Sequence, residues 1–410
     1  MKIIAIIGAS HSGVTCAEKL RHNGFQGRIL LLDRMPTLPV QRPPLSKSFL
    51  HSKISGFDSY LLRSAEFYEK EKIELLIGNA VVGIDAHAKI IYLENGSELN
   101  YNIIILAAGA DAKLPAYFAD KASNMHVLRD TTDAESLKAS MQQSQKAVIV
   151  GGGFIGLEVA SSLRIAGLSV DIIEIAPRLL ARVSTPQISD FFKSLHESKG
   201  VKVHLNEGLE EIIYSDSGLV KSVILSSGQR LECDLLIFGI GVSANTKLAK
   251  ELGLTISDGV LVNSNYSAAD DIYVIGDLAY CPDRASQRIE SVYHAQLSAA
   301  VAAASITDSA MPKQETFWFW SDQYEIKLQI AGLLPPLDEV ALIHTERRQG
   351  KRQDSFSVWS WYDNKLVSVE AINDPQAFMI GKKLIEQSAN PPHKLIADDS
   401  IALKQLLHSD

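Results

Sequence analysis

The amino-acid sequence predicts an α/β protein with two similar strand–turn–helix–strand units and a smaller C-terminal α+β domain. The first unit begins with the apolar run 3–7, which leads into the turn Gly8–Gly13. The same arrangement returns 143 residues later, where the apolar run 147–150 leads into the turn Gly151–Gly156. A buried parallel strand is apolar throughout, so each run is expected to form a central strand. An aromatic-rich segment begins at residue 318 and marks the start of the C-terminal domain.

Each glycine-containing turn is suited to binding a dinucleotide. Gly151, Gly153 and Gly156 have the G-x-G-x-x-G spacing that lets backbone N–H groups approach a pyrophosphate at a helix N-terminus. Asp33 and Glu174 follow the last glycine of their turns by 20 and 18 residues, where a carboxylate takes the ribose hydroxyls. Two Rossmann-like units in one chain predict two bound dinucleotides, and redox chemistry between FAD and NAD(P) is the usual reason.

The two units differ in how completely they match this pattern. Ser10 replaces the second glycine of the first turn, and its side chain narrows the approach to a pyrophosphate. We still favour a nucleotide site there. No Arg or Lys follows Glu174 until Arg178, which predicts a preference for NADH, because a carboxylate repels a 2′-phosphate. A solvated acid at a strand end is the alternative reading of Glu174.

The pattern of the first unit returns after the second unit has ended. Residues 271–277 form a strand-like run that ends in Gly276 and Asp277, and an alanine-rich helix is predicted over 294–306. The second unit is therefore an insertion within the first. We expect a discontinuous FAD-binding domain, an inserted NAD-binding domain and a C-terminal α+β domain, with boundaries at 1–110 plus 241–317, at 111–240, and at 318–410.

The C-terminal domain is predicted from alternating polar and apolar residues. Strands are expected at 326–332, 339–345, 355–362 and 365–372, followed by a helix near 375–388. A basic run follows the second of these strands, and we interpret it as a solvated hairpin tip. On an acidic protein it could also steer an acidic partner; its residues are Arg347, Arg348, Lys351 and Arg352.

Composition excludes several classes of protein. The chain is 46% hydrophobic and 21% charged, with no apolar run long enough to span a bilayer and no room for a signal peptide before the first strand. Three scattered cysteines favour a reducing, cytoplasmic location and offer no Cys-x-x-Cys pair to relay electrons. The net charge of −8 disfavours nucleic acid. The scattered histidines predict no metal site.

Two further groups have both a plain and a chemical interpretation. Prolines around residues 39–44 predict an extended loop before Lys47. Lys47 and Glu158 could be surface charges, or an ion pair beside the reacting rings that orients the nicotinamide carboxamide. Trp318 and Trp320 could be ordinary packing or a wall against the flavin. Asp277 could end a strand or accept a hydroxyl of the ribityl chain.

Six segments carry a resemblance to a known family. They are Arg42–Lys47, Gly151–Glu158, Gly239–Asn245, Gly276–Asp277, Arg288–Ser291 and Trp318–Gln323. With these segments the chain resembles, over nearly its whole length, the FAD-dependent ferredoxin reductases of bacterial multicomponent oxygenases of the Rieske and P450 types. The Trp-Ser-Asp-Gln element distinguishes this family from rubredoxin reductases and disulfide reductases.

The resemblance implies a glutathione-reductase-like fold and a reaction. Hydride passes from NADH to FAD, and single electrons pass to a 2Fe–2S ferredoxin that serves a terminal oxygenase in aromatic or terpenoid catabolism. A monomer or homodimer is expected. An NADH oxidase, a reductase of rubredoxin or quinone, and a redox-sensing flavoprotein similar to apoptosis-inducing factor are the alternatives.

The resemblance also implies site residues. Lys47 and Glu158 would flank the flavin–nicotinamide junction as catalytic residues. Those implied for FAD are Gly8, Ser12, Gly13, Asp33, Arg42, Lys47, Val81, Arg129, Asp277, Val292 and Trp320. Those implied for NAD are Gly151, Gly153, Ile155, Gly156, Glu158, Glu174, Arg182 and Gly241. The chain departs from the family at Ser10, at Ala108 and at His294, where a titratable imidazole close to the flavin could change its potential.

Overall fold

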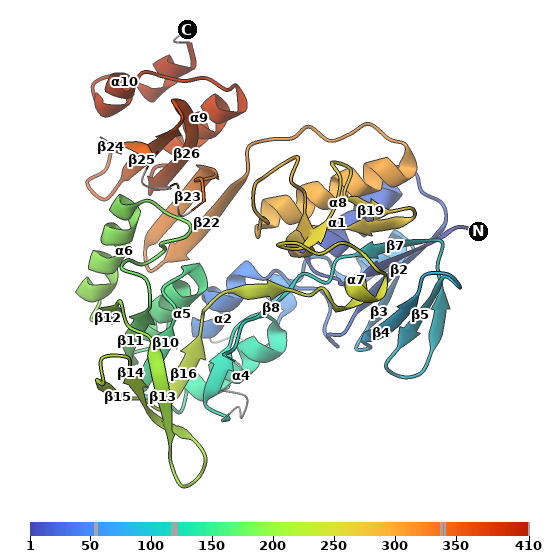
Figure 1. Cartoon of the computed structure of the whole chain (residues 1–410), viewed down its shortest axis with the longest axis horizontal. Helices are drawn as coiled ribbons and strands as arrows, with labels where there is room; N and C mark the ends of the chain where they lie inside the picture. The colour runs from blue at the N-terminus through green and yellow to red at the C-terminus, as the bar shows by residue number, and fades with distance from the viewer. Residues whose placement is uncertain (53–55, 116–121, 337–338, 340–341, 409–410) are drawn as a thin grey trace. The chain divides into compact units, whose positions relative to one another are not determined.

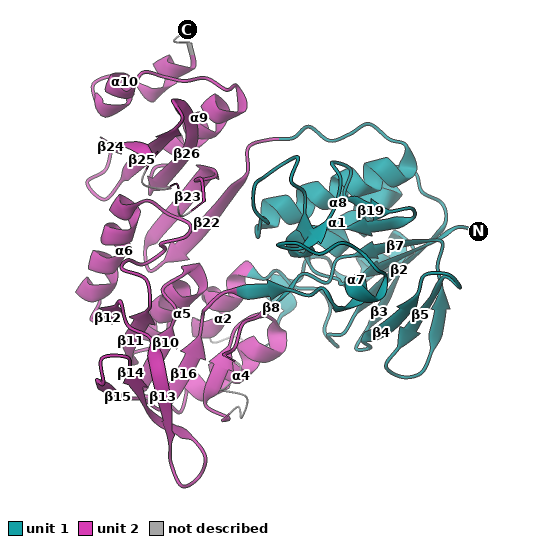
Figure 2. Cartoon of the chain, in the orientation of Figure 1, with its two compact units in different colours: residues 1–42, 55–111, 242–314 teal, residues 43–54, 112–241, 315–410 magenta. Residues whose placement is uncertain are grey.

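A computed structural model describes residues 1–52, 56–115, 122–336, 339 and 342–408. The chain folds into two compact units, each assembled from three separate stretches (Figure 2). Unit 1 comprises residues 1–42, 55–111 and 242–314, and unit 2 comprises residues 43–54, 112–241 and 315–410. Residues 112–241 belong to unit 2 and the stretches on either side of them to unit 1, while the predicted three domains and their boundaries stay a prediction.

A six-stranded sheet forms the centre of unit 1 (Figure 1). Its strands are parallel except the edge strand β19, and the buried, apolar β1 lies between β2 and β7. Helix α1 (His11–His22) packs against α8 (Val292–Thr307). In spatial order the strands are β19 (Ser267–Ala269), β20 (Ile272–Val274), β7 (Ile103–Leu106), β1 (Ile3–Ile7), β2 (Arg28–Asp33) and β3 (Ile73–Ile77).

Smaller elements complete unit 1. An antiparallel sheet contains β4 (Val81–Asp85), β5 (Ile90–Leu93) and β6 (Glu98–Asn100), and α7 (Lys247–Glu251) packs against β4. The remaining elements are η2 (Asp58–Tyr60), α3 (Ala65–Lys70), β18 (Val260–Leu261), η4 (Gly276–Leu278) and β21 (Ala279–Tyr280). The short strands β8 (Ala110–Ala112) and β17 (Val242–Ala244) lie where the chain passes from one unit to the other.

Unit 2 contains a second parallel sheet, of five strands. In spatial order they are β12 (Lys202–Leu205), β11 (Ser169–Glu174), β10 (Lys146–Val150), β16 (Leu235–Phe238) and β9 (Met125–Val127). An antiparallel meander shares a hydrophobic core with this sheet, and its strands are β13 (Leu209–Tyr214), β14 (Val220–Leu225) and β15 (Arg230–Glu232). The associated helices are α4 (Thr131–Met141), α5 (Phe154–Ile165) and α6 (Pro186–Ser198).

The proline-rich segment before Lys47 differs from the predicted extended loop. Residues Pro43–Ser46 form the 3₁₀ helix η1, and Ser48–His51 form the short helix α2; both pack against α5. Proline tolerates the first turn of a helix, where its missing N–H is not needed, so the prolines begin a helix here. The segment belongs to unit 2 although it interrupts the sequence of unit 1.

The C-terminal part of unit 2 is a five-stranded antiparallel sheet with helices packed on it. Strands β23 (Ile326–Gly332), β25 (Phe356–Tyr362) and β26 (Lys365–Ile372) confirm three of the predictions. The strand predicted at 339–345 is wrong in position: β24 spans His344–Gln349, and residues 340–341 lie outside the described part. The other elements are β22 (Trp318–Gln323), α9 (Pro375–Glu386), α10 (His393–Ala397) and η6 (Leu403–His408).

Among the described residues, no helix combines the length and apolarity that crossing a bilayer requires.

Candidate functional site

The two predicted turns have the same backbone conformation at their first glycine. Gly8 has φ +109° and Gly151 has φ +110°, a region that residues with a side chain rarely adopt. A Cβ on Gly8 would lie 2.3 Å from the carbonyl oxygen of Ala107, and one on Gly151 would lie 2.5 Å from that of Gly239. Both positions therefore require glycine, for conformation and for space.

The last glycine of each turn lets the following helix approach the turn closely. A Cβ on Gly13 would lie 1.8 Å from the carbonyl oxygen of Gly8, and one on Gly156 would lie 2.1 Å from that of Gly151. No rearrangement of a side chain could relieve these contacts, because backbone meets backbone. Each glycine fingerprint thus shapes its own turn before any ligand binds.

The acidic residue that ends each second strand is bonded to its turn. Asp33 accepts a hydrogen bond from the backbone N–H of Ala9 at 2.6 Å, and Glu174 accepts one from that of Gly152 at 2.6 Å. The other oxygen of each carboxylate accepts the N–H of Met35 or Ala176. These acids are therefore structural parts of the turn and not merely solvated. Their contact with a ribose stays a prediction.

The helix N-termini fit the phosphate-binding role. Neither N-cap residue, Ser10 for α1 or Gly153 for α5, makes a side-chain capping hydrogen bond, and neither first turn contains an acidic residue. The space within 4 Å of a Cβ built on Gly153 is empty. Helix N-termini of this kind attract anions through their N–H groups and dipole. The two turns therefore suit the pyrophosphates of FAD and of a nicotinamide dinucleotide.

Polar residues surround the first turn. Ser10 accepts a hydrogen bond from Nε of Arg42 at 3.4 Å. A Cβ on Gly276, whose φ is +69°, would lie 2.7 Å from Oγ of Ser12, so this glycine lets the Gly276–Asp277 segment approach the turn. Burial lowers the pKa of His11 to about 4, with the charge of Arg42 acting in the same direction and that of Asp277 opposing it. His11 is consequently neutral at pH 7.

Lys47 and Glu158 form the ion pair that the sequence left open. Nζ of Lys47 lies 2.7 Å from Oε2 of Glu158, and the Glu158 side chain is only 3% exposed. Oγ of Ser46 donates to Oε2 of Glu158 at 2.5 Å, and Lys47 also donates to the carbonyl oxygen of Pro43 at 3.2 Å. The plain interpretation as surface charges is wrong for Glu158. A buried carboxylate with this many donors has a fixed orientation.

A chain of hydrogen bonds leads away from the second carboxylate oxygen. Ser321 donates to Oε1 of Glu158 at 2.6 Å, and Nε2 of Gln323 donates to Oγ of Ser321 at 3.1 Å. Oε1 of Gln323 lies 2.8 Å from Nε2 of His196, whose Nδ1 is 3.3 Å from the hydroxyl of Tyr324. An amide oxygen only accepts, so His196 donates through Nε2 and accepts at Nδ1.

Every donor in this chain therefore points toward Glu158. Burial lowers the pKa of His196 to about 4, although its hydrogen bond to Gln323 opposes the shift. The imidazole is thus neutral at pH 7, as the donor pattern requires. Sequence reasoning missed Ser46, His196, Ser321 and Gln323 as site residues. The signal for two of them was the Trp-Ser-Asp-Gln element, where alternation puts Ser321 and Gln323 on one face of a strand.

Arg182 and Gly241, both predicted for NAD, lie together in unit 2. A Cβ on Gly241, whose φ is +97°, would lie 3.2 Å from Nη2 of Arg182. The nearby Arg178 has a different task, because its guanidinium donates to the carbonyl oxygens of Ser184 and Ala181. The loop after β11 is therefore held by one arginine, while the other lies against the glycine.

The remaining predicted residues are divided between the units. Val81 begins β4 and Val292 begins α8 in unit 1. In unit 2, the backbone N–H of Arg129 donates to Asp133 at 2.9 Å, and Ile155 is 44% exposed in the first turn of α5. The ring of Trp320 lies 5.5 Å from that of Trp318, centroid to centroid. Their contacts with cofactors stay predictions.

His294 cannot titrate near neutral pH as the sequence suggested. It is buried in α8, and its Nε2 lies 3.1 Å from the hydroxyl of Tyr266. Burial lowers the pKa of His294 to about 4. His294 is therefore neutral at pH 7, and its influence on a flavin stays a prediction.

The basic run contains one buried residue, contrary to its interpretation as a wholly solvated hairpin tip. Arg348 is 5% exposed, and its guanidinium donates to the carbonyl oxygens of Ile396 at 2.9 Å and Asp398 at 2.8 Å. Arg352 behaves as predicted, with an exposed ion pair to Asp354 at 2.6 Å. Arg348 is a structural residue because it donates to backbone carbonyls of the segment that follows His393.

All three cysteines lie in the described part of the chain and are buried and unpaired. Burial raises the pKa of both Cys16 and Cys233 to about 12, and it also raises the pKa of Cys281. A thiolate is the reactive form of cysteine, so these thiols are suited to packing. No cysteine can relay electrons as a redox disulfide.

Comparisons with known proteins agree with this geometry. The family model described as pyridine nucleotide-disulphide oxidoreductase matches residues 2–299, and the model described as reductase C-terminal matches residues 318–407. Rhodocoxin reductase of Rhodococcus erythropolis is 35% identical over 99% of this chain and 95% of its own. Terpredoxin reductase of a Pseudomonas species is 36% identical over 98% of this chain and 97% of its own.

Two further comparisons extend the similarity. Rubredoxin-NAD(+) reductase of Pseudomonas putida is 35% identical over 91% of this chain and 96% of its own. The solved structure of the covalent putidaredoxin reductase–putidaredoxin complex aligns with a TM-score of 0.93 and 31% identity over 99% of this chain and 98% of that chain. The chain therefore belongs to the pyridine nucleotide-disulphide oxidoreductase family.

Within that family it is a flavin-dependent NAD(P)H oxidoreductase of the ferredoxin reductase group. This confirms the resemblance, the fold and the enzyme class that the sequence predicts. The family implies FAD and NAD(P)H as its cofactors.

Proposed function

We propose that the protein is an NADH:ferredoxin oxidoreductase, in which the first turn binds FAD and the second binds NADH. The observation that carries the proposal is the pair of turns with one backbone geometry, in a chain whose cysteines are all buried. Bound FAD supplies the chemistry that accepts a hydride and returns electrons one at a time. A 2Fe–2S ferredoxin that serves an oxygenase would take those electrons.

Different residues of unit 1 would bind different parts of FAD. The N-terminus of α1 would face the pyrophosphate, and Asp33 would accept from the adenosine ribose while it still holds the turn. Arg42 is bonded to Ser10 and would add positive charge beside the phosphates. Asp277 follows a glycine that packs on Ser12 and would accept a ribityl hydroxyl.

Lys47 and Glu158 would orient the nicotinamide for hydride transfer. The buried hydrogen-bond chain from Tyr324 to Ser321 leaves Glu158 with a fixed direction, and the ion pair fixes Lys47 in turn. A preorganised charge pair does not have to reorganise when the reaction begins, which lowers the barrier. Both residues would act by position and field, and neither has to exchange a proton.

The position of Glu174 supports a preference for NADH over NADPH. Glu174 is bonded to Gly152 and Ala176, so its carboxylate stays at the end of β11, where a 2′-phosphate would meet its charge. Glu174→Gln keeps the size and one acceptor oxygen. It should lower the ratio of kcat/KM for NADH to that for NADPH by about tenfold. An unchanged ratio would show that another group decides the preference.

The main experiment uses the purified flavoprotein. It should be yellow, lose its colour when NADH is added without oxygen, and reduce cytochrome c rapidly only when a 2Fe–2S ferredoxin is added. A protein without flavin, or a flavin that NADH does not reduce, would contradict the proposal. Reduction by NADH with slow transfer to every ferredoxin tested would contradict the acceptor alone.

A second acceptor has support from one observation, the 35% identity to rubredoxin-NAD(+) reductase. The covalent complex of putidaredoxin reductase with putidaredoxin supports a ferredoxin-type partner instead. Parallel rates with ferredoxin, rubredoxin, quinone and oxygen would separate these acceptors. Slow turnover with all of them, together with a change of oligomeric state on reduction, would favour the redox-sensing alternative.

A further inference from the structure

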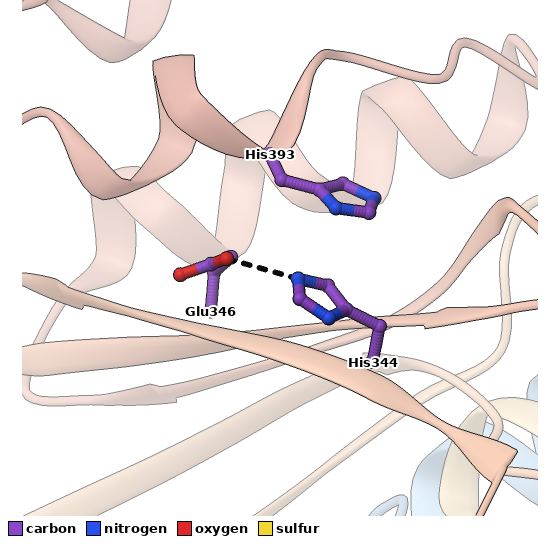
Figure 3. A group of neighbouring side chains, drawn as sticks. All are labelled: His344, Glu346 and His393. Atoms are coloured by element: carbon purple, nitrogen blue, oxygen red, sulfur yellow. Dashed lines mark hydrogen bonds and ion pairs between the residues drawn. The ribbon is translucent and has the colours of Figure 1, made fainter.

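Two imidazoles and one carboxylate, none of them among the residues proposed for catalysis, gather at the C-terminal sheet (Figure 3). The residues are His344 and Glu346 of β24 and His393, the first residue of α10. One candidate ligand atom from each lies within 4.8 Å of the other two. Nε2 of His344 is already 2.9 Å from Oε1 of Glu346. The sequence predicts no metal site, because His393 is 49 residues from His344.

The fold holds the third member of this cluster in place. Alternation along β24 puts His344, Glu346 and Arg348 on one face of the strand. The guanidinium of Arg348 donates to the carbonyl oxygens of Ile396 and Asp398, which belong to the segment that begins at His393. His393 is thereby kept over the face of β24 that carries the other two side chains. These hydrogen bonds help to keep the three side chains together.

Aromatic packing closes one side of the cluster and leaves another open. Trp361 is the cross-strand partner of His344, and its ring centroid lies 4.3 Å from that of His393. The two imidazoles stack with centroids 4.2 Å apart and an interplanar angle of 16°. The side chain of His344 is 51% exposed. Solvent and a small ion can therefore reach the cluster from the side of His344.

We propose that His344, Glu346 and His393 bind a divalent first-row transition metal such as Zn²⁺. Imidazole nitrogens select Zn²⁺, Cu²⁺ or Ni²⁺ over Mg²⁺ and Ca²⁺, which prefer oxygen ligands alone. Two histidines and one carboxylate are a known zinc-ligand set, and water would take the fourth position. The bound ion would tie the segment that begins at His393 to the sheet.

Binding requires a small local rearrangement. Metal–ligand bonds of about 2.0–2.2 Å put the ligand atoms of a tetrahedral site about 3.2–3.6 Å apart. Because the ligand atoms now lie within 4.8 Å of one another, the most distant pair has to close by up to about 1.2–1.6 Å, and the stacked rings have to turn. His344 is exposed enough to rotate. Without metal, the same residues form a hydrogen-bonded His–Glu pair and a ring stack, which is the arrangement that the test must distinguish from a binding site.

The test is calorimetric titration of the EDTA-treated, FAD-loaded protein with Zn²⁺. The wild type should bind one equivalent, and His344→Asn and His393→Asn should each weaken binding by at least about tenfold. Glu346→Gln should weaken it as well. His204→Asn is the matched control, because Nε2 of His204 lies 2.7 Å from Asp171 in a His–carboxylate pair outside this cluster. The control should bind Zn²⁺ as the wild type does.

Two measurements besides calorimetry also test the proposed metal site. Zn²⁺ should raise the melting temperature of the wild type but not that of His344→Asn, whose exposed position makes a folding defect unexpected. The electron paramagnetic resonance spectrum of bound Cu²⁺ should show coupling to imidazole nitrogen that His344→Asn and His393→Asn reduce. Absence of saturable Zn²⁺ binding, or binding that neither variant weakens, would overturn the proposal.

Discussion

The two glycine-containing turns have the same backbone conformation at their first glycine but differ in their side chains. At Gly8 and Gly151 the φ angles agree to within a degree, and in each turn an acidic residue from the second strand accepts an N–H of the turn. This part of the structure follows from steric exclusion and from one hydrogen bond, so it can recur in two units whose other residues have little in common.

The side chains differ from the second position of the turn onward, where Ala9 stands in the first turn and Gly152 in the second. The first turn has Ser10 followed by the buried, neutral His11, with Arg42 beside them. The second has Gly153, with open space at its Cβ, followed by Phe154, whose ring contacts Phe319. The first turn is thus built into a polar network, while the second leaves room beside the helix N-terminus. Under the proposed function, this difference would suit a tightly bound FAD at the first turn and an exchanging NADH at the second.

The largest effects are expected when this shared backbone is broken. Gly8→Ala and Gly151→Ala would each bring a Cβ within 2.3–2.5 Å of a carbonyl oxygen at a φ that alanine avoids. Each should cost more than about 3 kcal/mol locally. Gly8→Ala should purify without FAD, whereas Gly151→Ala should retain FAD and lose NADH binding. Flavin absorbance and NADH titration measure the two outcomes, and equal losses in both variants would contradict the assignment of turns.

The next effect concerns His11 and pH. The pKa of His11 is about 4 in the folded protein, against 6.5 for an unperturbed histidine, so the unfolded chain binds more protons between these values. Stability should therefore be full above pH 6.5 and fall as pH decreases toward 4, by up to about 3 kcal/mol from this residue. His11→Phe introduces the residue type that the second turn has at this position, Phe154. This variant should lose less stability as the pH decreases, and His11→Gln is its polar control.

Urea unfolding at pH 7.5 and pH 5.5, followed by FAD fluorescence, measures this dependence in unit 1. Burial also lowers the pKa of His196 to about 4, so unit 2 should weaken in acid as well. His196→Asn should flatten that part of the loss and leave FAD release unchanged. An equally steep decrease in His11→Phe would show that His11 does not contribute.

Removing the charge of Glu158 should slow flavin reduction by NADH, which is an effect of intermediate size. It should leave FAD binding by unit 1 unchanged. Glu158→Gln keeps acceptor and size but loses the ion pair with Lys47. Flavin reduction by NADH should slow by about 10- to 100-fold, while FAD content stays the same. Ser321→Ala removes one donor to Glu158 and should slow reduction less. Stopped-flow traces without oxygen measure both, and wild-type rates in Glu158→Gln would remove this residue from the reaction.

The smallest effects are expected from exchanging the third positions. Ser10→Gly should change FAD affinity by less than about threefold, because the hydrogen bond described for its side chain, from Arg42, is long at 3.4 Å. Gly153→Ser should weaken NADH binding by up to about tenfold, because its side chain would enter the open space beside the helix. Equilibrium titrations measure both. A larger effect at Ser10 than at Gly153 would reverse the interpretation of the two turns.

Much of the fold was predictable because its signals are local. Apolar runs predict β1 and β10, glycines predict the turns, and the spacing of Asp33 and Glu174 predicts where each second strand ends. Each of these signals acts through sterics or hydrophobic pattern over a few tens of residues. The helices formed by Pro43–His51 are an exception, because proline begins a helix as readily as it ends a strand.

The amino-acid sequence alone determined the two strand–turn–helix units, the family and the residues of the glycine fingerprints. Only the tertiary structure decided that Arg348 is buried, that Glu158 ends a chain of donors, and that His393 lies over His344. The physical reason is that these properties depend on which distant backbone and side-chain groups meet after the sheets have formed. Residue type determines which hydrogen bonds a group can donate or accept, and packing determines its partners.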